Sequence, residues 1–318
     1  MSSRANPPGD FRLMGIVNVT PDSFSDGGRF LDARAAVAHG HELVAQGADI
    51  LDIGGESTRP GAEPVSVAEE LRRVVPVIEG LAAGVQAGAG SGAGTPTQIS
   101  IDTSKATVAE AALGAGASLV NDVSAFRADP AMVGLVAASG AECCLMHMLG
   151  EPRTMQRDPH YGDVVDEVKA FLEERLRFVV GEGVAEERVL LDPGIGFGKT
   201  AQHNLELLRR LDELTELGRP LVIGTSRKSF LGRIVADAAG LAEPLDARHR
   251  LPGTLATNVL ALERGASVFR VHDVAPVREA LAVAAATLSG RWRASSGTTT
   301  TRTTMSGMTG KTGKSATS

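Results

Sequence analysis

Short apolar runs alternate with longer amphipathic stretches along most of the chain. The runs are three to seven residues long, as expected of strands buried on both faces, and the stretches between them place apolar residues at helical spacing. The predicted strands span residues 13–19, 50–53, 99–101, 119–123, 143–146, 189–191, 221–223 and 268–271. The predicted helices span residues 33–46, 67–81, 106–113, 131–138, 164–180, 204–214, 255–264 and 277–288.

This strict alternation of strand and helix indicates a parallel sheet. Eight strand–helix units over residues 11–289 match a single-domain α/β fold, the (β/α)8 or TIM barrel, in number and in length. An open, doubly wound sheet is the alternative architecture. Residues 1–10 are an N-terminal extension, and residues 84–97, rich in Gly, Ala, Ser and Thr, are predicted to form a surface insertion.

One local pattern recurs four times: a helix-ending Gly-Ala pair, an apolar run and then a polar side chain. Glycine closes a helix in the left-handed conformation, and the two-residue period of a strand places the fifth and seventh residues after it on one face. Asp52, Asn121 and Arg270 are therefore expected to converge, with His147 and His272 nearby. The copies are Gly47-Ala48 before Asp52, Gly116-Ala117 before Asn121, Gly140-Ala141 before Leu145 and His147, and Gly265-Ala266 before Arg270 and His272.

Any one of these polar residues, taken alone, is explained by a hydrogen bond to a neighbouring loop. Several of them at the carboxyl ends of separate apolar strands are harder to satisfy by packing, since each unpaired buried polar group costs roughly 1–3 kcal/mol. A polar ligand at the mouth of the barrel would satisfy them together, and we expect a ligand site there.

Composition and charge exclude several classes of protein. The chain has 318 residues, 43% of them hydrophobic, and a net charge of −6, which argues against general nucleic-acid binding. Residues 290–318 hold five basic residues and no acidic one, so the preceding 289 carry −11, and this Thr-rich tail is predicted to be disordered. No apolar run reaches membrane-spanning length and the N-terminus lacks a signal-peptide stretch, so a cytoplasmic protein is expected. The adjacent Cys143 and Cys144 are expected to be small core residues.

The glycine-rich segment 192–200 follows the sixth predicted strand but matches neither nucleotide-binding motif. A Walker loop needs glycine where Pro193 stands, and a dinucleotide fingerprint needs its third glycine where Lys199 stands. The glycines would instead allow the backbone to approach a flat ligand, and Asp192 at the strand tip can accept hydrogen bonds from ligand N–H groups.

Polar groups at the strand ends are of two kinds. Carboxylate and amide groups match the donor-rich edge of an aminopyrimidinone ring, whereas cationic groups suit an anion, and barrels often bind phosphate after strands seven and eight. For the cations, a solvent-facing salt bridge is the alternative. The first kind comprises Asp102, Asn121 and Asp192, and the second comprises Lys228, Arg270 and His272.

Two loops rich in turn-forming residues, 18–28 and 54–61, follow the first and second strands. A surface turn would explain either loop alone. Phe24 in the first loop, and Arg59 beside Pro60 in the second, are unusual in such turns, so both loops are predicted to be mobile lids over the barrel mouth.

Across residues 13–288 the chain resembles dihydropteroate synthases, a family of pterin-binding barrels. The resemblance implies a transferase that condenses (7,8-dihydropterin-6-yl)methyl diphosphate with 4-aminobenzoate through a pterin cation. The products would be 7,8-dihydropteroate and diphosphate, in folate biosynthesis, with Mg²⁺ assisting the leaving group and a homodimer as the assembly. The motifs that carry the resemblance are Asn18-Val19-Thr20-Pro21-Asp22-Ser23-Phe24-Ser25-Asp26-Gly27, Gly55-Glu56-Ser57-Thr58-Arg59-Pro60-Gly61, Ile101-Asp102-Thr103, Asn121-Asp122-Val123, Met146-His147-Met148, Asp192-Pro193-Gly194-Ile195-Gly196-Phe197-Gly198-Lys199, Ser226-Arg227-Lys228-Ser229 and Arg270-Val271-His272-Asp273.

The resemblance also implies roles for individual residues. The catalytic residues would be Asp26, Asp102, Asp192 and Lys228. The pterin ring would contact Ile16, Asp102, Asn121, Val123, Met146, Asp192, Phe197 and Lys228. The diphosphate would contact Asn18, Arg270 and His272, with Asn18 also a metal ligand. The 4-aminobenzoate site would consist of Thr58, Arg59, Pro60, Lys228 and Ser229, and the lid of Phe24 and Asp26.

Two other functions share parts of this pattern. A methyltransferase-type pterin barrel, which passes a methyl group from a folate to a corrinoid protein, has the same Asp and Asn grip on the pterin. It does not need the loop 57–60 or the pair Arg270 and His272. A non-catalytic pterin-binding protein would use the basic tail as its interacting part. The departures from the family's pattern, at 84–97, 124–127 and in the tail, remove no named site residue, which favours the enzyme.

Overall fold

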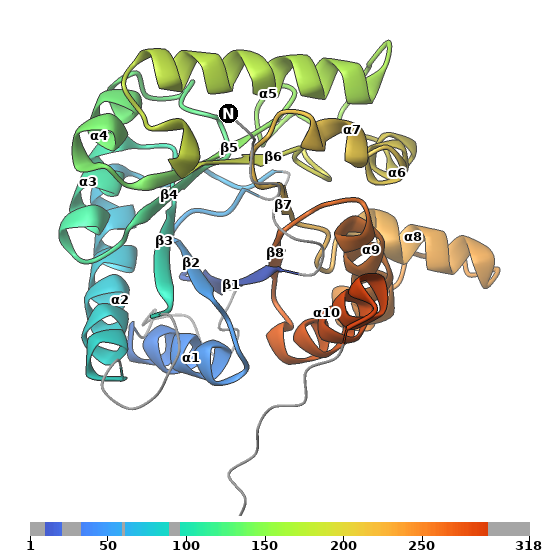
Figure 1. Ribbon diagram of the computed structural model, residues 1–318, viewed down its shortest axis with the longest axis horizontal. Helices are drawn as coiled ribbons and strands as arrows, with labels where there is room; N and C mark the ends of the chain where they lie inside the picture. Colours follow the sequence, from blue (N-terminus) through green and yellow to red (C-terminus); the bar gives the residue numbers. More distant parts are fainter. Residues whose placement is uncertain (1–9, 21–32, 59–60, 89–95, 292–318) are drawn as a thin grey trace, which may run out of the picture.

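The chain folds into a closed barrel of eight parallel strands surrounded by helices (Figure 1). The computed structural model describes residues 10–20, 33–58, 61–88 and 96–291. Neighbouring strands pair in the order β6-β5-β4-β3-β2-β1-β8-β7, and a parallel bridge between Leu191 and Leu221 joins β6 to β7. The predicted (β/α)8 barrel is therefore confirmed, and the open sheet is wrong because the bridge closes the ring. The strands are β1 (Arg12–Asn18), β2 (Ile50–Gly54), β3 (Gln98–Asp102), β4 (Leu119–Asp122), β5 (Glu142–Met146), β6 (Val189–Asp192), β7 (Val222–Ile223) and β8 (Val268–Val271).

The helices lie on the outside of the barrel and follow the strands in turn. Within the described ranges, none of them is long and apolar enough to cross a membrane. They are α1 (Ala33–Ala45), α2 (Val67–Gly88), α3 (Ala106–Gly114), α4 (Ala131–Ser139), α5 (Val164–Gly181), α6 (Ala201–Arg209), α7 (Asp212–Thr215), α8 (Ser229–Ala238), α9 (Leu251–Glu263) and α10 (Val274–Ser289), with short 3₁₀ helices at Glu186–Arg188 and Ala247–His249.

Two separate apolar cores hold the barrel together. The larger core lies between the strands and the helices, and the smaller one fills the barrel interior. Cys143 belongs to the first and Cys144 to the second, both as buried free thiols, so the prediction that they are core residues is confirmed. The interior layer consists of Met14, Ile50, Leu119, Cys144, Leu190, Val222 and Val268.

The positions of the polar side chains follow from the positions of the interior layer along each strand. Successive residues of a strand point to opposite faces, so the residue two positions after an interior residue also points into the barrel, one level nearer the carboxyl ends. In five strands that next residue is Asp52, Asn121, Met146, Asp192 or Arg270. The fold therefore stacks a largely polar level directly on an apolar one.

The Gly-Ala repeats end their helices in two different ways. In three copies the alanine N–H bonds the carbonyl five residues back and the glycine N–H bonds the carbonyl three residues back, which is the Schellman motif. These copies end at Gly47, Gly116 and Gly265. Gly140 instead bonds Val136 four residues back, as in the simpler left-handed cap.

The different cap shifts the third copy by one residue. Asn121 of β4 pairs with Cys144 of β5, which is the fourth residue after Gly140 rather than the fifth. Leu145 and His147 therefore point away from the barrel interior, toward the helices. The prediction that His147 lies near the converging group is wrong for this reason.

Helix α2 extends beyond its predicted bounds, and helix α8 is absent from the predicted elements. Helix α2 continues to Gly88, five residues into the predicted insertion, and residues 89–95 lie outside the described chain. A Cβ at Gly84 would lie 2.3 Å from Cε1 of His41, so this glycine lets α2 approach α1. Helix α8 was not predicted, and its Gly232 allows the carbonyl of Leu245 to pack 2.7 Å from where a Cβ would stand.

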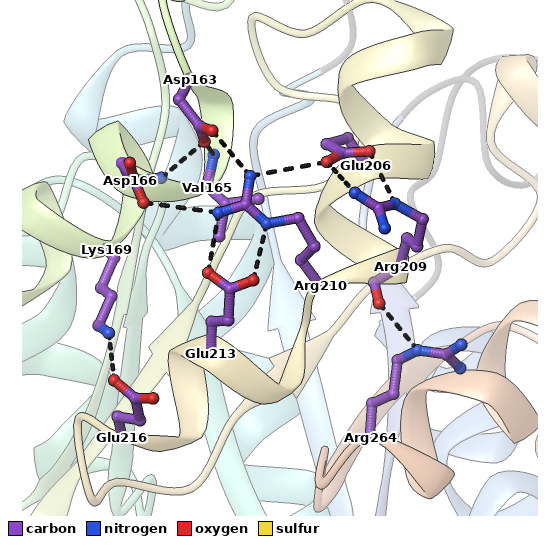
Figure 2. A network of polar contacts seen from close by, with 10 residues as sticks. All are labelled: Asp163, Val165, Asp166, Lys169, Glu206, Arg209, Arg210, Glu213, Glu216 and Arg264. Carbon is purple, nitrogen blue, oxygen red and sulfur yellow. Dashed lines mark hydrogen bonds and ion pairs between the residues drawn. The ribbon is translucent and has the colours of Figure 1, made fainter.

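The predicted helix 204–214 is broken into α6 and α7 at Arg210, whose side chain is the centre of a polar network (Figure 2). Arg210 donates to both carboxylate oxygens of Glu213, at 2.7 and 2.8 Å, and to Asp163 at 2.7 Å. Asp163 also caps α5 by accepting from the N–H groups of Val165 and Asp166. The network thus fastens α5 to the α6–α7 corner on the outer face of the barrel.

Replacing Arg210 is expected to lower the melting temperature more than replacing its neighbour Arg209. Arg210→Met leaves Asp163 and Glu213 without their common partner, whereas Arg209→Met removes a pair with Glu206 within one exposed helix turn. Thermal unfolding of both variants at low and high salt measures this. Because salt screens exposed charges, the difference should shrink at high ionic strength, and equal melting temperatures at low salt would contradict the assignment.

Candidate functional site

Charged side chains from three strands meet at the carboxyl end of the barrel. Arg270 of β8 donates from Nε to Asp52 Oδ2 at 2.6 Å and from Nη2 to Asp102 Oδ2 at 2.7 Å. Asn121 of β4 donates from Nδ2 to the same oxygen of Asp52, at 3.1 Å. The expected convergence of Asp52, Asn121 and Arg270 is confirmed, and Asp102 belongs to the same group.

Burial governs the acid–base behaviour of this group. Burial raises the pKa of Asp102, while the Arg270 guanidinium opposes the rise and the Asp52 carboxylate adds to it. Burial lowers the pKa of Arg270, but Asp52 and Asp102 outweigh that effect and hold the pKa above its ordinary value. Arg270 is therefore a permanent cation between two carboxylates.

The segment after β6 packs tightly against the end of β5. Asp192, whose pKa burial raises, accepts a hydrogen bond from the backbone N–H of Gly194 at 2.7 Å. Gly194, Gly196 and Gly198 all have positive φ. A Cβ at Gly194 would lie 1.8 Å from the carbonyl oxygen of His147, so the glycine is required by the close approach of two loops.

Lys228, the residue before α8, reaches over this glycine-rich segment. Its Nζ donates to the carbonyl oxygen of Ile195 and lies 4.5 Å from the centre of the Phe197 ring. Burial lowers the pKa of Lys228 to about 7, against the opposing charge of Asp192. Lys228 therefore links the loop after β7 to the loop after β6.

The loops after β7 and β8 also meet. Ser226 Oγ lies 3.0 Å from His272 Nδ1 and accepts a hydrogen bond from the backbone N–H of His272 at 3.1 Å. Arg227 donates to Asp273 at 2.9 Å. Ser229 is exposed at the first turn of α8, where backbone N–H groups favour an anion.

The predicted apolar walls of the site are placed around these polar groups. Met146, Val123 and Phe197 belong to one small cluster with Met148 and Met155. Ile16 lies two positions after Met14 of the interior layer and pairs with Asp52 in the β1–β2 register. Ile16 and Met146 therefore lie at the level of the charged group, whereas Val123 and Phe197 come after the ends of β4 and β6.

His147 takes no part in this group and instead packs behind it. Its ring lies edge-on to Phe171 of α5, with centroids 4.9 Å apart, and its Nδ1 is 2.8 Å from Nζ of Lys199. Lys199 also donates to the carbonyl oxygen of Phe197 at 3.0 Å, and burial lowers its pKa well below the ordinary value. This Lys–His contact could not be predicted from local sequence patterns, because the two residues are 52 positions apart.

An ion triad that the sequence did not reveal, with Glu70 buried and its two partners partly exposed, supports the loop after β2. Lys105 bonds Glu56 and Glu70, both at 2.5 Å, and Glu56 also accepts from the backbone N–H of Val65 at 3.0 Å. This closes the segment that carries Thr58, which is half-buried. Phe24, Asp26, Arg59 and Pro60 lie outside the described residues, so the predicted lid and part of the predicted 4-aminobenzoate site stay predictions.

A dedicated metal site is not built into the described ranges, where no three His, Cys, Asp or Glu side chains are grouped to hold an ion. Asn18, the predicted metal ligand, is partly exposed at the end of β1. A single amide oxygen suits Mg²⁺ that is held largely by substrate phosphates and water. The residues present therefore fit a metal that arrives with a phosphorylated substrate.

Chemically, the mouth combines hydrogen-bond acceptors and cations within one enclosure. Asp102, Asn121 and Asp192 supply the acceptors, and Arg270 and Lys228 supply the cations. Such a mouth can bind a flat heterocycle by its N–H edge and an anion beside it.

Comparisons with known proteins agree with this arrangement. The family described as "Pterin binding enzyme" matches residues 14–272. The dihydropteroate synthase of Synechocystis sp. is 44% identical over 281 residues, which cover 88% of this chain and 90% of the relative.

Solved structures give the same result. The Xanthomonas albilineans dihydropteroate synthase with 4-aminobenzoic acid is 47% identical with a TM-score of 0.76, covering 86% of this chain and 92% of that one. The dihydropteroate synthase from the same organism in complex with 7,8-dihydropteroate is 44% identical with a TM-score of 0.73, covering 87% and 93%.

Adding a methyl group at Gly194 is expected to be far more costly than adding one at Gly218. Both glycines have nearly the same φ, +67° and +69°, but a Cβ at Gly218 would meet nothing within 4 Å. We expect Gly194→Ala to lower the free energy of unfolding by at least about 3 kcal/mol and Gly218→Ala by about 1–2 kcal/mol. Urea unfolding measures both, and equal losses would show that the loop does not depend on the contact with His147.

The pH dependence of stability should reveal the buried ammonium of Lys228. The folded pKa is about 7 and the unfolded pKa is about 10.4, so between these values the unfolded state binds more protons and stability rises with pH. The free energy of unfolding of the wild type, minus that of Lys228→Met, should therefore rise by up to about 1 kcal/mol per pH unit in this window. A difference that stays constant with pH would contradict the lowered pKa.

Proposed function

The chain belongs to the dihydropteroate synthase family of pterin-binding enzymes, and from that premise we propose that it condenses (7,8-dihydropterin-6-yl)methyl diphosphate with 4-aminobenzoate. The products are 7,8-dihydropteroate and diphosphate, and the reaction belongs to folate biosynthesis. One observation supports the proposal most strongly. Arg270 bonds both Asp102 and Asp52, and Asp52 also bonds Asn121. This contact gathers acceptors and a cation at one barrel mouth.

The pterin ring binds to the acceptors. An aminopyrimidinone edge presents several N–H donors, and Asp102, Asn121 and Asp192 are the buried acceptors that line the barrel mouth. Met146, Phe197, Val123 and Ile16 enclose the two faces of the ring, and Lys228 donates to a ring acceptor. This division is supported by the placement of the apolar cluster beside Asp192 on β5 and β6.

The diphosphate binds on the cationic side. Arg270 lies on β8, His272 comes directly after the end of that strand, and Asn18 ends the neighbouring β1. Asn18 would also hold Mg²⁺, which would neutralise charge on the leaving group. Ser226 supports His272 through its hydroxyl, so the loop after β7 contributes to the same side.

The 4-aminobenzoate binds between the loop after β2 and the start of α8. Thr58, Arg59 and Pro60 come from the first, and Lys228 and Ser229 from the second. The N-terminus of α8 is suited to the benzoate carboxylate because its N–H groups carry partial positive charge. The structure of a 47% identical dihydropteroate synthase with 4-aminobenzoic acid supports this choice of ligand.

The chemistry follows an SN1-like course. The bond between the methylene carbon and the diphosphate oxygen breaks, and the electron pair leaves with diphosphate. Asp102 and Asp192, with Asp26 on the lid, stabilise the resulting pterin cation more than they stabilise the neutral ground state. The aniline nitrogen, which is unprotonated at neutral pH, then attacks the carbon and loses a proton, and Phe24 and Asp26 cover the reacting centre.

A homodimer in the cytoplasm completes the proposal. Helices α8, α9 and α10 each carry exposed apolar side chains, and α9 contacts both others; Figure 1 shows the three helices side by side. An apolar surface of this kind supports self-association. The free thiols of Cys143 and Cys144 fit a reducing compartment. The exposed side chains are Ile234, Val235, Leu260, Val283 and Leu288.

A direct assay tests the function. Purified protein is mixed with both substrates and Mg²⁺, and diphosphate release is measured together with dihydropteroate formation. One diphosphate is expected for each dihydropteroate formed. No diphosphate release above that of a heat-inactivated sample would overturn the enzyme assignment.

Lys228→Ala and Arg59→Ala should have different kinetic signatures. Lys228 contacts both subsites, so its loss should raise KM for both substrates by roughly tenfold or more, as expected for a lost charged hydrogen bond. Arg59 attracts the benzoate carboxylate alone, so Arg59→Ala should raise mainly the KM for 4-aminobenzoate. Steady-state kinetics with each substrate varied separates the two, and a change confined to the pterin substrate in Arg59→Ala would refute its placement.

A further inference from the structure

Asp52 is a buried carboxylate at the centre of the barrel mouth, with no exposed surface. Its Oδ1 accepts a hydrogen bond from Ser100 Oγ at 2.6 Å, and its Oδ2 accepts from Asn121 at 3.1 Å and from Arg270 at 2.6 Å. These donors come from β3, β4 and β8. Because the carboxylate is fully enclosed, it cannot touch a ligand itself, and its effect must pass through its partners.

The contact with Asn121 determines what Asn121 offers to a ligand. A primary amide has a donor end and an acceptor end, and an ionised carboxylate can only accept. Asn121 must therefore turn its NH2 group toward Asp52, which leaves its carbonyl oxygen for the site. An acceptor in this position matches a ring N–H, whereas a flipped amide would place donor against donor.

The contact with Arg270 fixes the plane of the guanidinium. Nε is bound to Asp52 and Nη2 to Asp102, so two carboxylates on different strands hold one rigid fork. Without Asp52, Arg270 keeps a single charged partner and is free to turn about it. Asp52 therefore fixes the orientation of two side chains. One is Asn121, which is assigned to the pterin, and the other is Arg270, which is assigned to the diphosphate.

We propose that Asp52 is a positioning residue that sets the hydrogen-bond polarity of the pterin site by orienting the Asn121 amide and the Arg270 guanidinium. The inference rests on the proposed function, because it assigns Asn121 to the pterin. Filling the barrel does not itself require a carboxylate here, since the interior positions one level below are apolar, and Asp52 also balances the charge of Arg270.

The test compares equilibrium binding of 6-hydroxymethyl-7,8-dihydropterin to the full-length wild type and to four variants by calorimetry. Asp52→Asn should weaken binding by roughly 10- to 100-fold, because a donor replaces an acceptor and the Asn121 amide loses its fixed orientation. Asp49→Asn is the matched control. It makes the same substitution just before β2, where Asp49 accepts from the N–H of Leu13 and from Arg278, and should change affinity by less than about twofold.

An exchange of the two groups distinguishes positioning from simple structural support. Asn121→Asp alone places two carboxylates side by side and should bind poorly. Asp52→Asn with Asn121→Asp restores one amide and one carboxylate in contact, with an oxygen again available to the ligand. The double variant should bind the dihydropterin at least about tenfold more tightly than Asn121→Asp.

Each outcome decides the inference. Unchanged affinity in a folded Asp52→Asn variant, or a double variant no better than Asn121→Asp, would overturn it. The second comparison remains decisive if Asp52→Asn alone does not fold. A wild type that binds no dihydropterin would contradict the proposed function instead, so the two failures are distinguishable.

Discussion

Buried charge at the mouth of the barrel has to be balanced within a few ångströms, and the arrangement of the site follows from that requirement. Asp52 and Asp102 lie in a region where burial disfavours their charged forms, and Arg270 bonds both. Lys228 lies near enough to Asp192 for each charge to favour the other. Carboxylates, an amide and cations therefore stand close together at one end of the barrel. A site built this way is poised for a substrate that carries both a heterocycle and an anion.

The polar side chains are brought together by the register of the paired strands, and no unusual local backbone structure is needed. An apolar level of side chains closes the interior, and the next inward positions, two residues further on, carry the polar groups. Tight packing behind the site then fixes the loops: Gly194 against the His147 carbonyl, Lys199 on the Phe197 carbonyl, and Lys105 between Glu56 and Glu70. Groups that touch no ligand thus determine where the ligand-binding groups stand.

The barrel, its strands and the converging residues could be predicted from the sequence because they depend on short-range periodicity. The Gly-Ala repeat correctly predicted that Asp52, Asn121 and Arg270 converge, but it misplaced His147. The reason is that a glycine in the sequence does not show whether the preceding helix ends in a Schellman motif or in the simpler left-handed cap. Glycine also misled at Gly84, which was assigned to a surface insertion but lies within α2. The Lys199–His147 contact and the Lys105 triad join residues far apart in sequence, and no local pattern encodes such pairs.

The central claim is that the acceptors of a single barrel mouth hold the pterin, while Arg270 and His272 beside them hold the departing anion. A crystal structure of the protein with a dihydropterin and diphosphate tests it most directly. We expect the ring edge to lie within hydrogen-bond distance of Asp102, Asn121 and Asp192, and the diphosphate to lie beside Arg270 and His272. A pterin bound away from these carboxylates, or a diphosphate at another face of the molecule, would contradict it.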